Sequence, residues 1–430
     1  MRYDELYLWF LADPAQPRHV GRLRLVDAGK GVSLQYGSDW LAGGFPLSED
    51  LVLTDIEQLP RWKGMAVGAV DDARPDRWGE RVIQYLDKPA RLSLMEYLYY
   101  AGDDRFGALG VSTSQAAYVP RTTGPLPRLE QAQALSEAVH KVSAREPVSN
   151  LERRMLNAGG SFGGAKPKAL IDIGGVQWVI KFYDNEPVDV PLIEHASMTL
   201  AQLAGIDAAE TQVVALAGEN ALAVRRYDRD GSKRIHCISA GTALRAQTVA
   251  GQEPDLGYPN LAQLLRRAGV TDEDLNLRDM RELFRRMVFN ILIDNTDDHE
   301  KNHTLRVVAP TRQGRYRLAP AYDILPTNSG QGYQEFIVGT DGRDSTLSNA
   351  MSQSELFGYT PAQAGAEVVR VIRVVDGWRE HFAACRVTAS DIQSLAERID
   401  GELLLGQRRA FKPEDYAATR ASKRPSPFAG

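Results

Sequence analysis

Three polar residues in the second half of the chain have the types and spacing that phosphoryl transfer requires. Asp297 and Asn302 lie five residues apart in one polar run, and Asp323 follows in a separate segment. Transfer of a γ-phosphoryl group needs a carboxylate that orients or deprotonates the acceptor hydroxyl, and oxygen ligands that hold Mg²⁺ against the phosphates. The spacing therefore predicts Asp297 as catalytic base and Asn302 and Asp323 as metal ligands.

Two other interpretations of this run remain open. Asp and Asn in a polar connection often do no more than bind backbone groups of a turn. His299 and His303 also match the H-E-x-x-H pattern of zinc proteases, which places both imidazoles on one face of a helix. Apolar residues at helical spacing predict a helix over residues 278–294, and this helix ends before the run. The poor helix formers that follow it disfavour the zinc site.

Composition sets broad limits on the class of protein. The chain has 430 residues, of which 43% are hydrophobic and 25% charged, and this is typical of a globular protein with two or three domains. A net charge of −5 gives no overall attraction to nucleic acid. The N-terminus lacks an apolar signal core and no run is long enough for a membrane span, so we expect a cytoplasmic protein without a membrane contact. Cys237 and Cys385 fit a reducing compartment.

The first part of the chain reads as a small mixed α/β domain. Residues 1–115 contain short strand-like runs separated by Gly, Asp and Pro, with helical segments near residues 77–86 and 92–100. Residues 116–150 then combine a proline-rich linker with a docking helix. At the other end, residues 408–430 are basic and proline-containing, which predicts a flexible tail.

A nucleotide-binding segment is expected upstream of the polar run. A glycine-rich stretch can bring backbone N–H groups against phosphate oxygens, although its spacing matches neither the Walker nor the eukaryotic kinase pattern. Its central residues are Ser161, Phe162, Gly163 and Gly164. A predicted hairpin over residues 168–182 ends near Lys181, where a kinase places its phosphate-binding lysine. A helix containing Glu194 follows, and in kinases such a Glu pairs with that lysine.

The order of these segments predicts a two-lobed architecture. Residues 151–225 form a nucleotide-binding lobe and residues 226–407 a mainly helical catalytic lobe. The segment Arg225, Arg226 and Tyr227 lies where a kinase chain crosses between lobes and meets adenine. The fold class expected is α+β, with a protein-kinase-like fold preceded by the short-strand domain.

Several segments together resemble the HipA family of serine/threonine kinases, the toxins of type II toxin–antitoxin pairs. Residues 72–82 and 100–108 resemble the N-terminal domain of the family. Residues 161–168 are similar to its phosphate loop, and residues 296–302 and 321–323 to its catalytic and metal-binding motifs. The resemblance extends over nearly the whole chain.

The resemblance implies an ATP- and Mg²⁺-dependent protein kinase. It assigns Asp297 as base, Asn302 and Asp323 as Mg²⁺ ligands, Lys181 as phosphate-binding residue, and His299 and Lys301 as further nucleotide contacts. Ser161 corresponds to the serine whose autophosphorylation inactivates members of the family, and the added charge beside the ATP phosphates explains such a switch. The implied partners are an aminoacyl-tRNA synthetase as substrate and a HipB-like DNA-binding antitoxin, through which operator DNA is contacted indirectly.

Two alternatives to a protein kinase are a lipid or small-molecule kinase with a D-x-H-x-x-N loop, and a catalytically decayed corepressor. One departure from the family pattern bears on activity. Asp298 stands where a small residue often follows the base, and we expect it to add a carboxylate next to the metal site.

Overall fold

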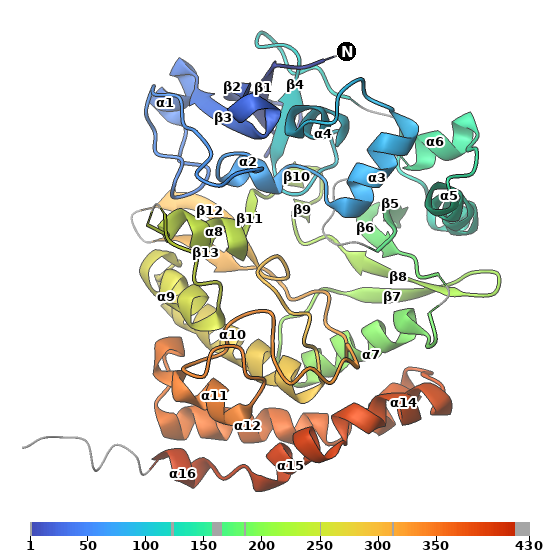
Figure 1. Cartoon of the computed structure of the whole chain (residues 1–430), viewed down its shortest axis with the longest axis vertical. Coiled ribbons are helices and arrows are strands. Elements are labelled where there is room, and N and C mark those ends of the chain that lie inside the picture. The colour runs from blue at the N-terminus through green and yellow to red at the C-terminus, as the bar shows by residue number, and fades with distance from the viewer. Residues whose placement is uncertain are drawn as a thin grey trace, which may run out of the picture. The chain divides into compact units, whose positions relative to one another are not determined.

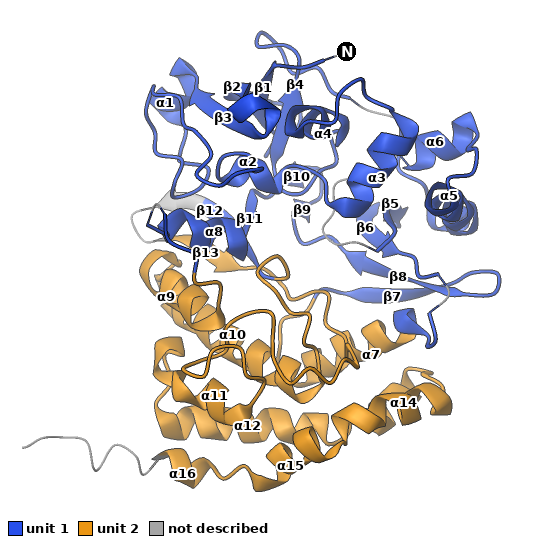
Figure 2. Ribbon diagram, viewed as in Figure 1, with its two compact units in different colours: residues 1–191, 209–254, 303–311 blue, residues 192–208, 255–302, 312–430 orange. Residues whose placement is uncertain are grey.

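The computed structural model describes residues 2–121, 124–156, 166–184, 186–249, 251–311 and 314–417. The chain divides into two compact units (Figure 2). Unit 1 contains residues 1–191, 209–254 and 303–311, and unit 2 contains residues 192–208, 255–302 and 312–430. None of the helices in the described ranges is long and apolar enough to cross a membrane.

The first sheet of unit 1 is antiparallel, with strand order β3-β2-β1-β4. Helix α4 contacts all four of its strands. The sheet and its helices contain β1 (Glu5–Phe10), β2 (Arg18–Val26), β3 (Gly31–Tyr36), β4 (Leu109–Ser112), α1 (Ser38–Gly43), α2 (Ala69–Asp72), α3 (Arg77–Leu86) and α4 (Leu94–Tyr100). These elements confirm the predicted mixed α/β organisation of the first part of the chain (Figure 1).

The second sheet of unit 1 is also antiparallel, with order β5-β6-β8-β7. It contains β5 (Lys168–Ile173), β6 (Val176–Lys181), β7 (Thr211–Ala215) and β8 (Asn220–Arg225). Gly174 and Gly175 join β5 to β6 with φ of 63° and 82°. Such positive φ values suit the tight turns of two-residue hairpins, so the predicted hairpin and its turn are confirmed.

Helices from the first 160 residues cover this second sheet. Trp78 of α3 belongs to the same hydrophobic core as residues of α5 (Ala132–Ala144), α6 (Asn150–Leu156) and the sheet. Its indole Nε1 donates to the carbonyl of Lys168 at 2.7 Å. The core explains why α3 and the β5–β8 sheet fall in one unit, whereas the sequence placed them in separate domains.

The described part of unit 1 also includes several further strands and helix α8. These are β9 (Arg229–Asp230), β10 (Lys233–Arg234), β11 (Cys237–Ser239), α8 (Ala240–Gln247) and β12 (Thr304–Thr311). Strand β11 pairs with β12 in antiparallel fashion. Residues 226–254 belong to the same compact unit as β5–β8, so the division between the units does not coincide with the lobe boundary expected after residue 225.

Unit 2 is mainly helical, as predicted for the C-terminal region. It contains most of α7 (Val190–Leu203), then α9 (Tyr258–Ala268), α10 (Leu275–Leu292), β13 (Gly314–Leu318), α11 (Leu347–Ser352), α12 (Pro361–Val375), α13 (Trp378–Ala384), α14 (Ala389–Ile399), α15 (Glu402–Ala410) and α16 (Pro413–Ala417). Helix α10 packs against α9 and α12, and its buried apolar residues include Leu283, Met287 and Ile291.

The prediction of a tail from residue 408 is wrong at its start. Arg408 lies in α15 and is only 6% exposed. Its guanidinium pairs with Asp376 and Asp400 at 2.9 and 2.7 Å. The basic residue therefore stabilises the packing of the C-terminal helices. Residues 418–430 lie outside the described part of the chain.

Candidate active site

The polar run predicted to carry the chemistry is a loop that follows α10. Helix α10 ends at Leu292, and no helix forms between this end and β12. The predicted end of the helix before the run is confirmed, so His299 and His303 do not lie on one helical face. Within the described ranges, no group of three or more His, Cys, Asp and Glu side chains is arranged to hold a metal ion.

Asn302 is oriented by contacts inside this loop. Its side-chain Nδ2 donates to the backbone carbonyl of Asp297 at 3.3 Å, and its backbone N–H donates to the carbonyl of His299 at 2.9 Å. The residue is 7% exposed. Because Nδ2 is engaged with the loop, Oδ1 is the atom that can act as an acceptor or a metal ligand.

Asp323 lies in a second loop, after β13, and has an unusual backbone conformation. Its φ is +60°, in the left-handed region that residues other than glycine rarely adopt. Asp adopts this conformation more readily than most residues, and other described residues such as Asp27 and Asp274 share it. A functional role for Asp323 stays a prediction.

Hydrogen bonds connect the Asp323 loop to the Asp297 loop. The hydroxyl of Tyr322 donates to the carbonyl of Lys301 at 2.6 Å. On the other side, the hydroxyl of Thr327 donates to the carbonyl of Asp294 at 2.8 Å and lies 2.6 Å from the hydroxyl of Thr296. Contacts on both flanks of Asp323 thus fix the two loops to each other, and the three predicted residues are brought to one place.

The electrostatics of Asp297 reflect this arrangement. Although Asp297 is exposed as a residue, partial shielding of its carboxyl from solvent raises the pKa of that group. The nearby His299 lowers the pKa, and the negative charges of Asp323, Glu335 and Asp298 raise it again. The overall direction is upward. A carboxylate surrounded by other carboxylates is suited both to accepting a proton and to lying beside a cation. Glu335 was not identified from the sequence.

Asp298 has a different environment from the one expected. It is 3% exposed and accepts hydrogen bonds at Oδ2 from the hydroxyl of Tyr258 and from Nδ2 of Asn290, the latter at 2.9 Å. Asn290 also accepts from Nδ2 of Asn295 at 3.1 Å through its own Oδ1. The Asp298 carboxylate therefore anchors the loop to α9 and α10, and it does not simply add a ligand at the metal site.

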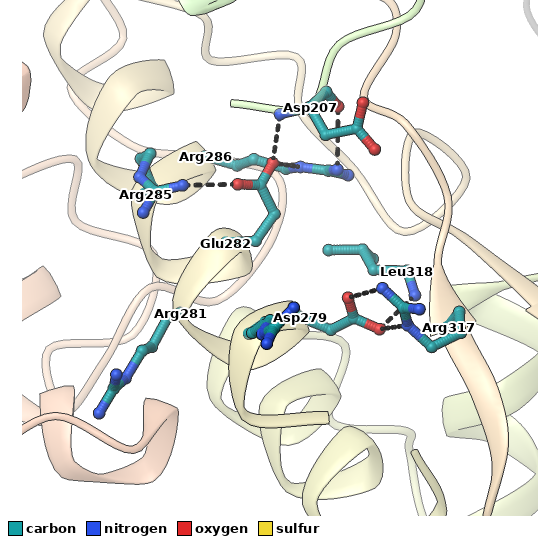
Figure 3. A pocket seen from close by; sticks show the side chains of 9 residues that line it. Asp207, Asp279, Arg281, Glu282, Arg285, Arg286, Arg317 and Leu318 are labelled. Carbon is teal, nitrogen blue, oxygen red and sulfur yellow. Dashed lines mark hydrogen bonds and ion pairs between the residues drawn. The ribbon is translucent and has the colours of Figure 1, made fainter. Parts of the chain in front are cut away.

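Helix α10 also holds the segment that leads to Asp323 (Figure 3). Asp279 accepts from the guanidinium of Arg317 at 2.8 and 3.1 Å and from the backbone N–H of Leu318 at 2.9 Å. Arg286 donates to the carbonyl of Ala319 at 2.9 Å. These residues line or adjoin a cavity of about 370 Å³.

Asp279, Arg286 and Asn290 are spaced seven and four residues apart, so they lie on one face of α10. This polar face positions both loops. The sequence signal for this face is that the three polar residues recur at the same helical spacing as the apolar residues of this amphipathic helix.

On the nucleotide side, Lys181 lies at the end of β6 as predicted. The register of the hairpin places Lys168 directly opposite it, so the two side chains share one face of the sheet. Both residues are less than a tenth exposed, at 6% for Lys168 and 8% for Lys181. The register therefore places Lys168 beside the residue that is predicted to bind phosphate. Lys168 was not identified from the sequence as a site residue.

The other residues predicted to bind the nucleotide lie in different parts of the chain. Ser161, Phe162, Gly163 and Gly164 lie outside the described residues. Glu194 is fully buried in α7, which begins at Val190, and belongs to unit 2 while Lys181 belongs to unit 1. An ion pair between the two stays a prediction.

Arg225 is exposed and pairs with Glu210 at 3.1 Å, and the hydroxyl of Tyr227 lies 2.9 Å from that of Thr304. The Arg226 side chain is buried among protein groups, so this residue can contribute to nucleotide binding only through its backbone. His299 accepts at Nδ1 from the backbone N–H of exposed Lys301 at 3.2 Å. Nucleotide contacts by His299 and Lys301 stay predictions.

Comparison with protein families gives two matches that together cover most of the chain. Residues 15–112 match the HipA N-terminal domain, and residues 160–378 match the HipA-like C-terminal domain. Among solved structures, HipA from the complex of Shewanella oneidensis HipA, HipB and operator DNA superposes with a TM-score of 0.65. That match covers 96% of this chain and 99% of the other at 17% identity, and it shows the same fold.

Two curated relatives come from Sinorhizobium fredii, and each is described as a candidate kinase. Y4dM is 34% identical over 167 residues, which cover 36% of this chain and 38% of the relative. Y4mE is 26% identical over 212 residues, which cover 47% and 49%. The chain thus spans less than half the length of the curated relatives that it matches.

Proposed function

Because this chain belongs to the HipA family, we propose that it is an ATP- and Mg²⁺-dependent kinase that phosphorylates serine or threonine in a protein. The proposal rests on two loops that are joined by hydrogen bonds and that bring Asp297, Asn302 and Asp323 together. Oxygen ligands of this kind suit Mg²⁺, which binds few protein groups and takes further ligands from phosphates.

In this proposal Asp297 orients the acceptor hydroxyl and accepts its proton. The raised pKa of its carboxyl favours that role. Asn302, through Oδ1, and Asp323 would hold Mg²⁺, which supplies charge neutralisation at the transferred phosphate. Lys181 and Lys168 would bind the phosphate chain, and residues 225–227 would meet the base.

Transfer of labelled phosphate tests the proposal. We expect the purified protein with γ-labelled ATP and Mg²⁺ to label proteins of a cell extract, and Asp297→Asn to lower the rate at least about a hundredfold, because general base catalysis contributes about that much. Glu380→Gln, which removes an exposed carboxylate on α13, is the matched control and should retain activity. Label that enters only lipid would support the alternative of a lipid kinase, and equal background transfer by wild type and Asp297→Asn would support a decayed corepressor.

We propose self-inactivation through Ser161 as a second property. A phosphate on this residue would add nearly two negative charges to the segment expected to bind the ATP phosphates. Preincubation with ATP should therefore lower the activity of the wild type, and Ser161→Ala should prevent the loss. Equal loss in both proteins would contradict this regulation.

The partners are proposed by analogy. The related HipA structure contains HipB and operator DNA, which supports a HipB-like antitoxin for this chain and contact with operator DNA only through that partner. The acceptor protein proposed is a component of translation, by family analogy an aminoacyl-tRNA synthetase, whose modification would slow growth.

A further inference from the structure

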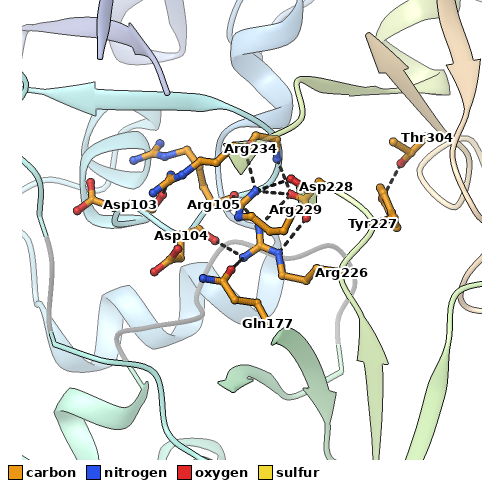
Figure 4. A network of polar contacts seen from close by, with 11 residues as sticks. Asp103, Asp104, Arg105, Gln177, Arg226, Tyr227, Asp228, Arg229, Arg234 and Thr304 are labelled. Carbon is orange, nitrogen blue, oxygen red and sulfur yellow. Dashed lines mark hydrogen bonds and ion pairs between the residues drawn. The ribbon is translucent and has the colours of Figure 1, made fainter. Parts of the chain in front are cut away.

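A buried polar network joins residues 226–229 to residues 103–107 (Figure 4). At its centre, the Arg226 side chain is 1% exposed. Its guanidinium donates to both carboxylate oxygens of Asp228 at 2.9 Å, to the carbonyls of Asp104 and Arg105 at 3.1 Å, and to Oε1 of Gln177 at 3.1 Å. These five bonds equal the number of N–H donors that a guanidinium has.

Asp228 connects the same segment to Gly107. Its Oδ2 accepts from the backbone N–H of Gly107 at 2.8 Å and from Nη1 of Arg229 at 3.0 Å. Arg229 in turn donates to the carbonyls of Gly107 and Arg105, at 3.0 and 2.9 Å. Burial raises the pKa of the Asp228 carboxyl, but the charges of Arg226 and Arg229 outweigh this effect and hold the pKa well below its usual range. The buried carboxylate is therefore ionised and strongly bound.

Residues 103–107 are themselves fixed within the N-terminal part of unit 1. Arg105 is fully buried and donates to the carbonyls of Ala73 and Leu98, at 3.2 and 2.9 Å. Gly107 has φ of +72°, and a Cβ added there would lie 3.3 Å from the backbone nitrogen of Cys237. The loop is thus a rigid support, and side chains cannot easily be added to it.

The side chains of residues 226–228 alternate in direction. Arg226 and Asp228 contact the loop of residues 103–107, whereas Tyr227 contacts Thr304. Alternation of this kind is expected of extended backbone. Contacts on both sides therefore fix the backbone of residues 226–228.

We propose that residues 103–107, acting through Arg226 and Asp228, position the 225–229 backbone to bind the adenine ring. This inference rests on the proposed function, because it assumes that the segment contacts the nucleotide. It assigns Arg226 and Asp228 as positioning residues, and it gives the N-terminal domain a part in nucleotide affinity.

Binding of two ligands by Arg226→Lys tests the inference. Lysine keeps the positive charge but cannot form the five hydrogen bonds that the Arg226 guanidinium donates. We expect the Kd for ATP to rise about tenfold, within the range of typical coupling between sites. The Kd for inorganic tripolyphosphate should not change, because that ligand lacks adenine. The control is Arg121→Lys, since Arg121 also forms a partly buried pair in unit 1, with Asp87 at 2.7 Å, and should leave both values unchanged.

Unchanged ATP affinity in folded Arg226→Lys, or an equal loss for ATP and tripolyphosphate, would overturn the inference. If the wild type binds neither ligand, the proposed function itself fails. Hydrogen exchange of the wild type gives a second test that needs no variant. ATP should slow exchange of residues 103–107 together with residues 225–229, and tripolyphosphate should not. Protection of residues 225–229 alone would also overturn the inference.

Discussion

At the scale of single residues, Asp297 and Asp298 are neighbours in sequence but have different environments. Asp297 is exposed in the loop, whereas Asp298 is buried and bound by Tyr258 and Asn290. Asp297 could be predicted because its spacing from Asn302 is a local property of the sequence. The anchoring of Asp298 could not, because Tyr258 lies 40 residues away and the contact exists only after folding.

The anchoring makes a prediction for Asn290. We expect Asn290→Ala to lower the free energy of unfolding by about 2–3 kcal/mol, because it removes a hydrogen bond to a buried carboxylate. Urea unfolding measures this change. Asn276→Ala, on the same helix but with only a 3.5 Å contact to the Arg266 carbonyl, should change stability by less than about 0.5 kcal/mol. Equal effects of the two substitutions would contradict the proposed anchor.

At the scale of secondary-structure elements, the sequence predicted most of the site-bearing segments closely. The hairpin of β5 and β6 and the end of α10 before the polar run agree with the structure, because periodicity and turn residues are local signals. The pairing across the hairpin could not be read from the sequence with the same certainty, because it depends on the register of the two strands. It places Lys168 opposite Lys181, the residue proposed to bind phosphate.

The lysine pair makes a prediction for ATP binding. Lys168→Met keeps a long side chain at this position but removes its charge, so it should weaken ATP binding about tenfold. The ATP-induced rise in Tm should therefore fall. Thermal unfolding with and without ATP measures this change. A variant that loses stability but keeps the full ATP-induced rise would show that Lys168 has only a structural role.

At the scale of the whole molecule, the predicted fold class is confirmed, and the two compact units divide the chain differently from the predicted domains. The N-terminal strands and the β5–β8 sheet form one unit, because α3, α5 and α6 contribute to a single hydrophobic core with that sheet. Local patterns do not reveal which apolar faces meet. The same long-range packing creates the hydrogen-bond network at Arg226. From the sequence, this residue was expected only as part of the connection between the two lobes.

The proposal that this chain phosphorylates a protein through Asp297 can be tested in cells by quantitative phosphoproteomics. Wild type and Asp297→Asn would be expressed at equal levels, with Glu380→Gln as the control. We predict phosphoserine or phosphothreonine on a translation component in cells with wild type and Glu380→Gln, and its absence with Asp297→Asn. The same phosphorylation sites at equal occupancy in all three would contradict the account.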